Sequence, residues 1–290
     1  MSRNSGFFNT IIIFLTIYIN ICLAYKPVFI IHGVLSANLS MIPLSRRIKE
    51  MHKGTEVYIS NRFDGWASLE PMWVQTKKFG ADLLNISRQY PDGIHLIGYS
   101  QGGLIARAIL EKYPEHNVHT FISLSSPQAG QYGTQFLKVV FPNLVRASAY
   151  KLFYSVAGQL TSVGNYWNDP HQQELYYNYS AFLPLLNNEL SEKRNDTFKD
   201  GLLKLKRMVL IGGPDDGVIT PWQSSLFGYF DSDENIVDLR KRDIYANDYI
   251  GLKKLEKEKK LIMITASGVH HFFWRKNVSV IDNYILPYLD

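Results

Sequence analysis

The pentapeptide Gly98-Tyr99-Ser100-Gln101-Gly102 stands between a strand pattern and a helix pattern, and few backbone arrangements accommodate it. The apolar run at 95–98 predicts a buried strand, and residues 103–110 carry apolar side chains at helical spacing. Strand, G-x-S-x-G and helix in this order predict a sharp turn that lifts the Ser100 hydroxyl above a sheet edge, where a nucleophile would lie. A glycine-rich turn with an incidental serine is the alternative.

Two backbone amides beside Ser100 are candidates for an oxyanion hole. The Gln101 amide would lie at a helix N-terminus directly after Ser100, where backbone N–H groups stabilise negative charge. The segment Ile31-His32-Gly33-Val34 follows the first predicted strand, and we expect its Val34 amide to supply the second donor. The alternative for this segment is a tight turn that takes no part in chemistry.

Six apolar runs bounded by turn residues predict strands. They lie at 27–31, 57–60, 95–98, 120–124, 207–212 and 261–265. Helical patterns lie between them, for example Leu44, Ile48 and Met51. Continuous apolar strands that alternate with helices predict an α/β fold, with a mostly parallel sheet covered by helices on both faces. The sequence has 290 residues, a length that a single α/β domain can have. We expect residues 25–290 to form one domain.

The alternation of strands and helices breaks between about residues 130 and 206. This stretch is rich in Phe, Leu and Tyr but lacks strand rhythm. It begins shortly after Leu124-Ser125-Ser126-Pro127, at the end of a predicted strand. We therefore interpret it as a helical insertion that forms a cap over a site at the sheet edge. Additional helices packed on the core are the alternative.

Residues 1–24 have the layout of a secretory signal peptide. Arg3 is followed by an apolar run from Thr10 to Ile19, and Ala24 precedes the predicted cleavage point. An uncleaved anchor is the alternative, although the run is short for a membrane span. Cys22, the single cysteine, would leave with the peptide. The mature chain would then have no thiol, no disulphide and no cysteine-ligated metal site.

Five N-x-S/T sequons follow the predicted signal peptide, and in a secreted chain they predict glycosylation and surface exposure. The candidate asparagines are Asn38, Asn85, Asn178, Asn195 and Asn277. The net charge of +5 is modest, and much of the basic charge lies in short runs such as 253–260. No basic stripe interleaved with aromatic residues occurs in the sequence, so we expect no nucleic-acid binding.

A serine nucleophile needs a base and a third group that orients the base. In folds with this strand–turn–helix element, the acid and then the histidine follow the serine along the chain. Asp215 and Asp216 follow the apolar run at 207–212, and His270 and His271 follow the run at 261–265. Catalytic groups gather at such strand ends in open α/β sheets. Sequence spacing alone barely separates the two members of either pair.

Four segments of the chain resemble the palmitoyl-protein thioesterase family. They are V-F-I-I-H-G at 28–33, G-Y-S-Q-G-G at 98–103, I-S-L-S-S-P-Q-A-G-Q-Y-G at 122–133 and G-G-P-D-D-G-V-I-T-P-W-Q-S-S at 212–225. The last two are most similar to the palmitoyl-protein thioesterase 2 branch, the lysosomal thioesterases. The resemblance covers the chain from about Tyr25 to the C-terminus.

The resemblance implies an α/β-hydrolase fold, a soluble lysosomal glycoprotein and hydrolysis of long-chain fatty acyl thioesters such as palmitoyl-coenzyme A or S-palmitoylated substrates. It also implies that Asp216 and His271 complete a catalytic triad with Ser100, although related sequences would tolerate His270. Relatives usually carry disulphides, so the expected lack of them in this chain is a departure. We expect no cofactor and no metal, and an acyl thioester as the substrate.

Two other functions fit the same sequence features. A secreted or lysosomal lipase or carboxylesterase would share the triad and the cap, because nothing in a triad separates thioesters from oxygen esters. A hydrolase-fold binding module without activity is a more remote alternative, since such modules typically lack a triad member. We expect a thioesterase that reaches the lysosome through the secretory pathway, with no stable membrane insertion after signal cleavage.

Overall fold

The computed structural model describes residues 25–140, 143–144 and 146–290. The predicted signal peptide and Cys22 lie outside these residues. Within the described part of the chain, no helix combines the length and hydrophobicity that crossing a membrane requires.

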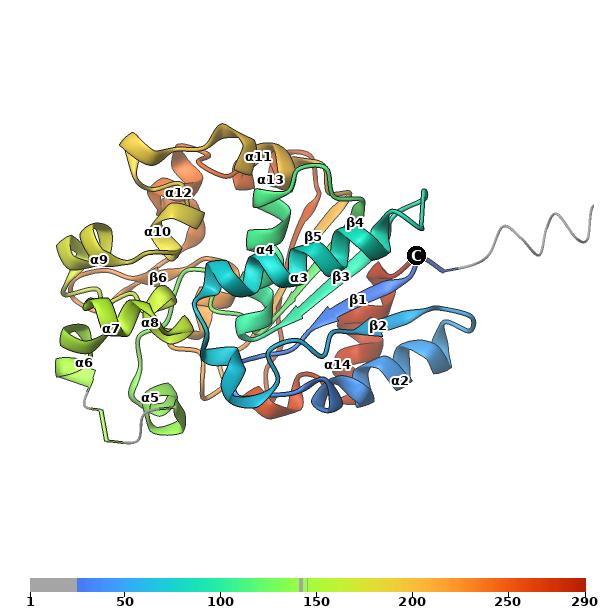
Figure 1. Ribbon diagram of the computed structural model, residues 1–290, viewed down its shortest axis with the longest axis horizontal. Helices are drawn as coiled ribbons and strands as arrows, with labels where there is room; N and C mark the ends of the chain where they lie inside the picture. The colour runs from blue at the N-terminus through green and yellow to red at the C-terminus, as the bar shows by residue number, and fades with distance from the viewer. Residues whose placement is uncertain (1–24, 141–142, 145) are drawn as a thin grey trace, which may run out of the picture.

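Six parallel strands form the central sheet, in the order β2-β1-β3-β4-β5-β8 (Figure 1). Their bounds are β1 (Val28–Ile31), β2 (Val57–Ile59), β3 (Ile94–Tyr99), β4 (Val118–Leu124), β5 (Arg207–Gly212) and β8 (Leu261–Thr265). The register places Ile97 beside Ile30 on one side and Ile122 on the other. All six runs predicted from the sequence form strands of this sheet, so the expected α/β fold is confirmed.

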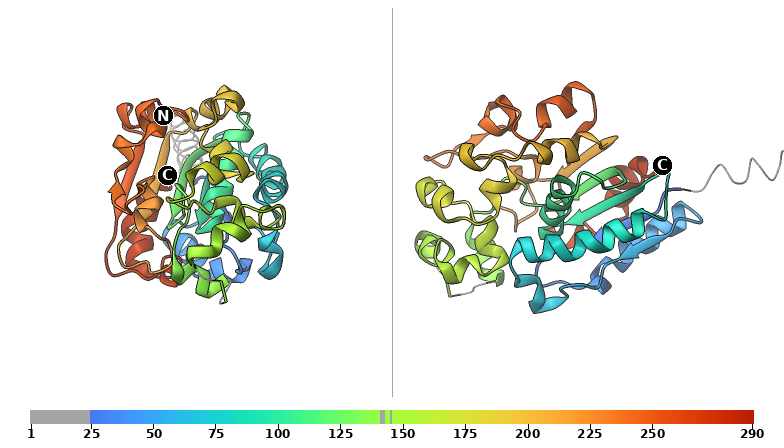
Figure 2. Two further views of the ribbon diagram at one scale, coloured as in Figure 1. Left: turned by 90° about the vertical axis from the view of Figure 1, so that its left-hand side faces the viewer. Right: turned by 45° about the horizontal axis from the view of Figure 1, so that its top comes forward.

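Helices cover both faces of the sheet, as Figures 1 and 2 show. The α-helices are α2 (Ile42–Met51), α3 (Met72–Ser87), α4 (Gln101–Lys112), α5 (Thr134–Val140), α6 (Arg146–Phe153), α7 (Val156–Gln159), α8 (Ser162–Tyr166), α9 (Gln173–Tyr179), α10 (Leu183–Leu186), α11 (Asp196–Leu203), α12 (Asp243–Ala246), α13 (Leu252–Lys257) and α14 (Val278–Val280). Shorter turns of helix include η1 (Asn38–Met41), η2 (Gly65–Leu69), η4 (Trp222–Leu226) and η6 (His271–Phe273), and a π-helix spans η7 (Ile281–Ile285).

The two faces of the sheet carry separate apolar cores. Leu96 and Phe121 belong to the core under α3, α4, α11 and α13. Their strand neighbours Ile97 and Ile122 belong to the core under α2, α14 and η7. Because successive strand residues point to opposite faces, a sheet that is covered on both sides favours apolar residues at successive positions. This preference explains the continuous apolar runs in the sequence.

Helices α5 to α11 follow β4 and precede β5, within the stretch that we interpret as an insertion. Figure 1 shows α5 to α10 grouped at the left, beyond the carboxyl ends of the strands, whereas α11 packs on α4. Beside this group lies an antiparallel pair of two-residue strands, β6 (Tyr229–Phe230) and β7 (Ile236–Val237). The role of these helices as a cap stays a prediction.

A buried arginine joins α4 to the helices beyond the sheet. Arg107 donates from Nε to Gln128 Oε1 at 2.7 Å and from Nη2 to Asn187 Oδ1 at 2.8 Å. Its Nη1 lies 3.1 Å from Glu111 Oε1, and both charged side chains are fully buried. Buried charges are retained only where they are paired and hydrogen-bonded. The network therefore fixes the chain just after α10 against α4.

Candidate active site

Ser100 sits in a strained turn between β3 and α4. Its φ is +55°, a value that non-glycine residues rarely adopt, and its backbone N–H donates to the Leu124 carbonyl at 2.9 Å. A Cβ atom on Gly102 would lie 2.4 Å from the Ile31 carbonyl oxygen and 2.5 Å from that of His32. The helix thus starts in close contact with the end of β1, and only glycine permits this approach. The turn presents the Ser100 side chain at the carboxyl edge of the sheet.

His271 and Asp216 lie beside Ser100 at this edge. Asp216 follows β5 and His271 follows β8, so both come from strands on the same side of β3. The distance from Ser100 Oγ to His271 Nε2 is 3.0 Å. His271 Nδ1 lies 2.9 Å and 3.1 Å from the two carboxylate oxygens of Asp216. All three side chains are buried, and this hydrogen-bonded row has the order of a nucleophile, a base and an orienting acid.

The Asp216 carboxylate accepts hydrogen bonds from main-chain and side-chain donors. Oδ1 accepts from the backbone amides of Val218 at 3.0 Å and Ile219 at 2.7 Å. Oδ2 accepts from Trp274 Nε1 at 2.6 Å and from Ser125 Oγ at 2.5 Å. Burial raises the pKa of this carboxyl, but hydrogen bonds from His271, Ser125 and Ile219, with the charge of His271, outweigh burial and lower the pKa. The side chain is therefore held ionised.

The backbone of His271 is fixed by two hydrogen bonds. Its carbonyl accepts from the Tyr99 hydroxyl at 2.8 Å, and its amide donates to the Asp216 carbonyl at 2.8 Å. The Tyr99 hydroxyl itself accepts from Arg275 Nη1 at 3.2 Å. Tyr99 directly precedes Ser100 in the chain, so the residues around the serine also position the histidine.

The second member of each titratable pair lies outside this cluster. Asp215 is exposed, and its Oδ2 accepts from the Gly268 amide at 2.6 Å. His270 is also exposed and precedes the short helical turn η6 that carries His271. The structure thus brings Asp216 and His271 to Ser100, whereas Asp215 and His270 face solvent.

The Val34 and Gln101 amides, our oxyanion-hole candidates, belong to segments that border Ser100. A Cβ on Gly33 would lie 2.9 Å from Ser100 Cβ and 3.4 Å from its Oγ, so the Gly33–Val34 backbone passes beside the hydroxyl. Gln101 is the first residue of α4. Among the described residues, neither amide donates to another group of the protein. Both N–H groups therefore remain available to an external acceptor.

A pocket of about 130 Å³ opens at Ser100 and His271. Its lining is mainly apolar and comprises Gly33, Val34, Leu35, Ser36, Tyr99, Ser100, Phe136, Val218, His271, Phe272 and Arg275. Phe136 belongs to α5, so the predicted insertion contributes a wall of this pocket. Phe272 directly follows His271 and is 51% exposed, which places it at the rim. Apolar walls with a few polar groups at one end suit a hydrocarbon chain that carries a reactive carbonyl.

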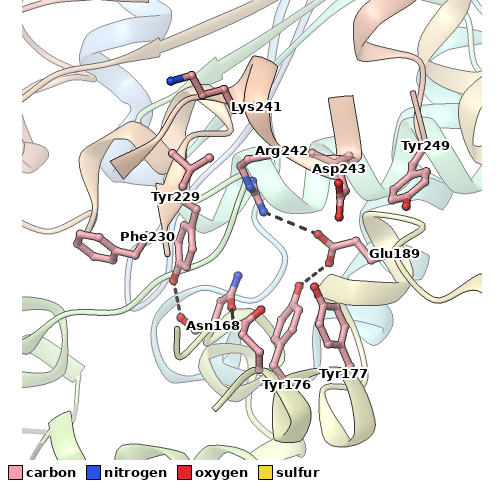
Figure 3. Close-up of a pocket in the computed structure, with 13 residues that line it drawn as sticks. Asn168, Tyr176, Tyr177, Glu189, Tyr229, Phe230, Lys241, Arg242, Asp243 and Tyr249 are labelled. Carbon is pink, nitrogen blue, oxygen red and sulfur yellow. Dashed lines mark hydrogen bonds and ion pairs between the residues drawn. The ribbon is translucent and has the colours of Figure 1, made fainter. Parts of the chain in front are cut away.

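Figure 3 shows a second pocket, of about 280 Å³, between α9, the end of α10 and the segment from β6 to α12. None of the predicted site residues lines it. Several of its polar groups bind one another: the Tyr176 hydroxyl donates to Glu189 at 3.0 Å, and the Tyr229 hydroxyl donates to the Asn168 carbonyl at 2.5 Å. Arg242 lies 3.7 Å from Glu189. We therefore place the chemistry at Ser100 and not in this polar pocket.

One group of described residues has the spacing of metal ligands. His95, His119 and Asp290 offer ligand atoms within 4.8 Å of one another. The group lies at the start of β3, whereas Ser100 follows the end of that strand. Arg207 Nη1 lies 3.2 Å from the Asp290 carboxylate and would compete with a cation. This group cannot contribute to chemistry at Ser100.

The five sequon asparagines lie at or near the surface. Asn85, Asn178 and Asn195 are exposed, and Asn38 and Asn277 are half-buried. The Asn277 side chain accepts a hydrogen bond from the Val280 amide, and that of Asn195 accepts from the Thr197 amide. Glycosylation of these residues stays a prediction.

Two side chains that contact Asp216 are not among the predicted site residues. Ser125 appears in the sequence only as part of the entrance to the insertion, and Trp274 follows the histidine pair without any pattern of its own. One sequence feature could have indicated Ser125 as a site residue. It directly follows β4, a central strand that neighbours β5, the strand that precedes Asp216. No sequence pattern marks Trp274, because its contact depends on the path of the chain after η6.

Comparison with known protein sequences shows the family to which this chain is related. The sequence model of the family described as palmitoyl protein thioesterase matches residues 27–271. A lysosomal thioesterase PPT2 homolog from Drosophila melanogaster is 52% identical over 94% of both chains. Lysosomal thioesterase PPT2 from Homo sapiens is 43% identical over 92% of this chain and 88% of the human protein. The resemblance that was inferred from four short segments is thus confirmed over most of the length.

Solved structures with low sequence identity share the fold. The mature lipase BlEst2 from Bacillus licheniformis has a TM-score of 0.53 at 14% identity and covers 92% of this chain and 93% of its own. An extracellular α/β-hydrolase from a Paenibacillus species has a TM-score of 0.50 at 13% identity, with 91% and 98% covered. The expected α/β-hydrolase fold is confirmed.

Proposed function

The chain belongs to the palmitoyl-protein thioesterase family, and we propose that it hydrolyses long-chain fatty acyl thioesters with Ser100 as the nucleophile. The family makes it a thioester hydrolase. The observation that carries the role of Ser100 is the hydrogen-bonded row from its Oγ through His271 to Asp216, with distances of 3.0 Å and 2.9 Å. We assign His271 as the base and Asp216 as the group that orients it.

The first step of the proposed reaction forms an acyl-enzyme. Ser100 Oγ attacks the acyl carbonyl while His271 Nε2 takes the hydroxyl proton. The negative charge that develops on the carbonyl oxygen is stabilised by the free amides of Val34 and Gln101. The tetrahedral intermediate collapses, the carbon–sulfur bond breaks, and His271 returns the proton to the departing thiolate.

The second step releases the fatty acid. A water molecule takes the place of the thiol, and His271 removes a proton from it as it attacks the acyl-serine. Collapse of this second intermediate breaks the bond to Ser100 Oγ, which regains its proton from His271. Throughout the cycle Asp216 remains ionised, because its hydrogen-bond donors favour the charged carboxylate.

The pocket supports an apolar acyl chain as substrate. Val34, Leu35, Phe136, Val218 and Phe272 line the space next to Ser100. Burial of a hydrocarbon chain against such side chains is worth about 0.8 kcal/mol for each methylene group. We propose that the acyl chain leaves the Ser100 carbonyl position along these walls, and that Phe272 contacts it at the rim.

We propose a lysosomal location that is reached through the secretory pathway. The relatives from Drosophila melanogaster and Homo sapiens are named as lysosomal thioesterases. The signal-peptide pattern at 1–24 and the five sequons support entry into the secretory pathway. After cleavage the enzyme would act as a soluble glycoprotein on acyl thioesters.

Replacement of the nucleophile tests the proposed chemistry. The purified Ser100→Ala variant should lose essentially all hydrolysis of palmitoyl-coenzyme A while its thermal unfolding midpoint stays within a few degrees of wild type. Alanine removes only the Oγ atom, and it must adopt the same positive φ as the serine it replaces. Turnover by the variant at a substantial fraction of the wild-type rate would exclude Ser100 as the nucleophile.

A further inference from the structure

We propose that Ser125 is a positioning residue, whose hydroxyl fixes the Asp216 carboxylate and thereby the His271 ring. The proposal rests on the triad assigned above. Ser125 directly follows β4, the strand that lies between β3 and β5 in the sheet. The order of the strands therefore places it between the Ser100 turn and the loop that carries Asp216.

Among the described residues, the polar contacts of the Ser125 hydroxyl are confined to the acid and the base. Its Oγ lies 2.5 Å from Asp216 Oδ2 and 3.4 Å from His271 Nδ1, and the residue is fully buried. Ser125 does not line the pocket at Ser100. It can thus affect the reaction through Asp216 and His271 without contacting the substrate.

The backbone of Ser125 gives independent support for a role of the hydroxyl. Its φ is +44°, in the left-handed region that favours glycine. A residue with a side chain is held there at a cost in free energy, and such positions cluster at functional sites. Glycine would relieve this strain but would remove Oγ. The only polar contacts of that oxygen in the described structure are those to Asp216 and His271.

The ionised Asp216 carboxylate can only accept hydrogen bonds, so the single proton of the Ser125 hydroxyl lies in its bond to Oδ2. His271 Nδ1–H and Trp274 Nε1–H also donate to Oδ2, whereas the Val218 and Ile219 amides hold Oδ1. Both carboxylate oxygens are therefore fixed before the reaction begins. When His271 gains the Ser100 proton, its new charge meets a carboxylate that does not need to reorient.

Loss of the Ser125 hydroxyl should change the chemical step and leave substrate binding intact. With one donor fewer on Oδ2, the Asp216 carboxylate is less firmly oriented and aligns the His271 ring less well with Ser100. The pKa of Asp216 rises as well, because the Ser125 hydrogen bond is one of the contacts that lower it. We expect kcat for palmitoyl-coenzyme A to fall about tenfold, which corresponds to ~1.4 kcal/mol. KM should stay within about twofold, because the substitution removes no contact between the enzyme and the bound substrate. The acid limb of the kcat–pH profile should move to higher pH.

The variants Ser125→Gly and Ser125→Ala test this inference, with Ser126→Ala as the matched control. Ser126 is an equally buried neighbour whose Oγ accepts from Gln128 Nε2 at 3.2 Å and does not contact Asp216. Glycine suits the φ of residue 125, so Ser125→Gly should keep the wild-type unfolding midpoint while kcat falls. Ser126→Ala should keep both kcat and the pH profile.

A second measurement separates positioning from general destabilisation. In an Asp216→Asn background, Ser125→Gly should cause little further loss of kcat, because its effect passes through the carboxylate. Losses that multiply, or an unchanged kcat and pH profile in Ser125→Gly, would overturn the inference. If the Ser100→Ala variant hydrolyses palmitoyl-coenzyme A at the wild-type rate, the proposed triad itself is wrong. If hydrolysis depends on Ser100 but not on Ser125, only the positioning role is lost.

Discussion

At the scale of single residues, two neighbouring aspartates lie in opposite environments. Asp216 is 2% exposed and accepts hydrogen bonds from His271, Ser125 and Trp274, whereas Asp215 faces solvent. A turn of the backbone after β5 points consecutive side chains in different directions, so adjacent residues of the same type differ completely in their surroundings. The carboxylate that matters is the one whose donors keep it ionised and aligned.

Exchange of each aspartate for asparagine should separate their roles. Asp216→Asn should lower kcat by on the order of 10³–10⁴-fold, because a neutral amide neither fixes the His271 tautomer nor stabilises the imidazolium. Asp215→Asn removes an exposed carboxylate and should leave kcat within about threefold of wild type. Steady-state kinetics on palmitoyl-coenzyme A measure both, and circular dichroism checks the fold. A large loss in Asp215→Asn with little loss in Asp216→Asn would contradict the assignment.

At the scale of elements, the strands of the sheet were predictable from the sequence and the details at their ends were not. Both faces of the sheet are buried, so β1, β5 and β8 contain unbroken apolar runs, and β3 and β4 are mainly apolar with few polar residues between. The β6–β7 hairpin has two residues in each strand, which is too short to produce a period. The helices α7, α8 and α10 are similarly short, with four or five residues each.

The site shows the same division between pattern and geometry. Ser100 could be predicted because the glycines around it mark the close approach of α4 to β1. The choice of Asp216 and His271 over their neighbours required the resemblance to a family, since side-chain direction in a loop has no sequence period. The contact of Ser125 with Asp216 joins residues 91 positions apart. It depends on β4 and β5 being neighbours in the sheet, which no local pattern records.

At the scale of the whole molecule, buried neutral histidines couple stability to pH. His116 is 4% exposed, donates from Nε2 to the Gly201 carbonyl at 2.9 Å and accepts from the Val118 amide at Nδ1. These bonds join α11 to β4, and protonation of Nδ1 would break one of them. Burial lowers the pKa of His116 to about 4. The unfolded chain takes up this proton near the ordinary histidine pKa of ~6.5, so acid favours unfolding.

The contribution of His116 should be fully present above about pH 6.5 and lost as the pH falls to about 4. The full loss amounts to about 3 kcal/mol, from a difference of ~2.5 pKa units. Urea unfolding at several pH values between 4 and 7 should show a smaller decline for His116→Gln than for wild type. His270→Gln, which replaces an exposed histidine, should keep the wild-type decline. Parallel curves for wild type and His116→Gln would refute this explanation.

The most direct test of the account compares initial rates on two substrates with the same acyl chain. Wild-type enzyme should hydrolyse palmitoyl-coenzyme A far faster than 1-palmitoylglycerol, with both rates measured under identical conditions and corrected with Ser100→Ala. A thiolate leaves more readily than an alkoxide, and the pocket supplies the same acyl contacts to both substrates. The predicted result is a Ser100-dependent preference for the thioester. Preference for the oxygen ester would contradict the proposed substrate class and would indicate a lipase activity.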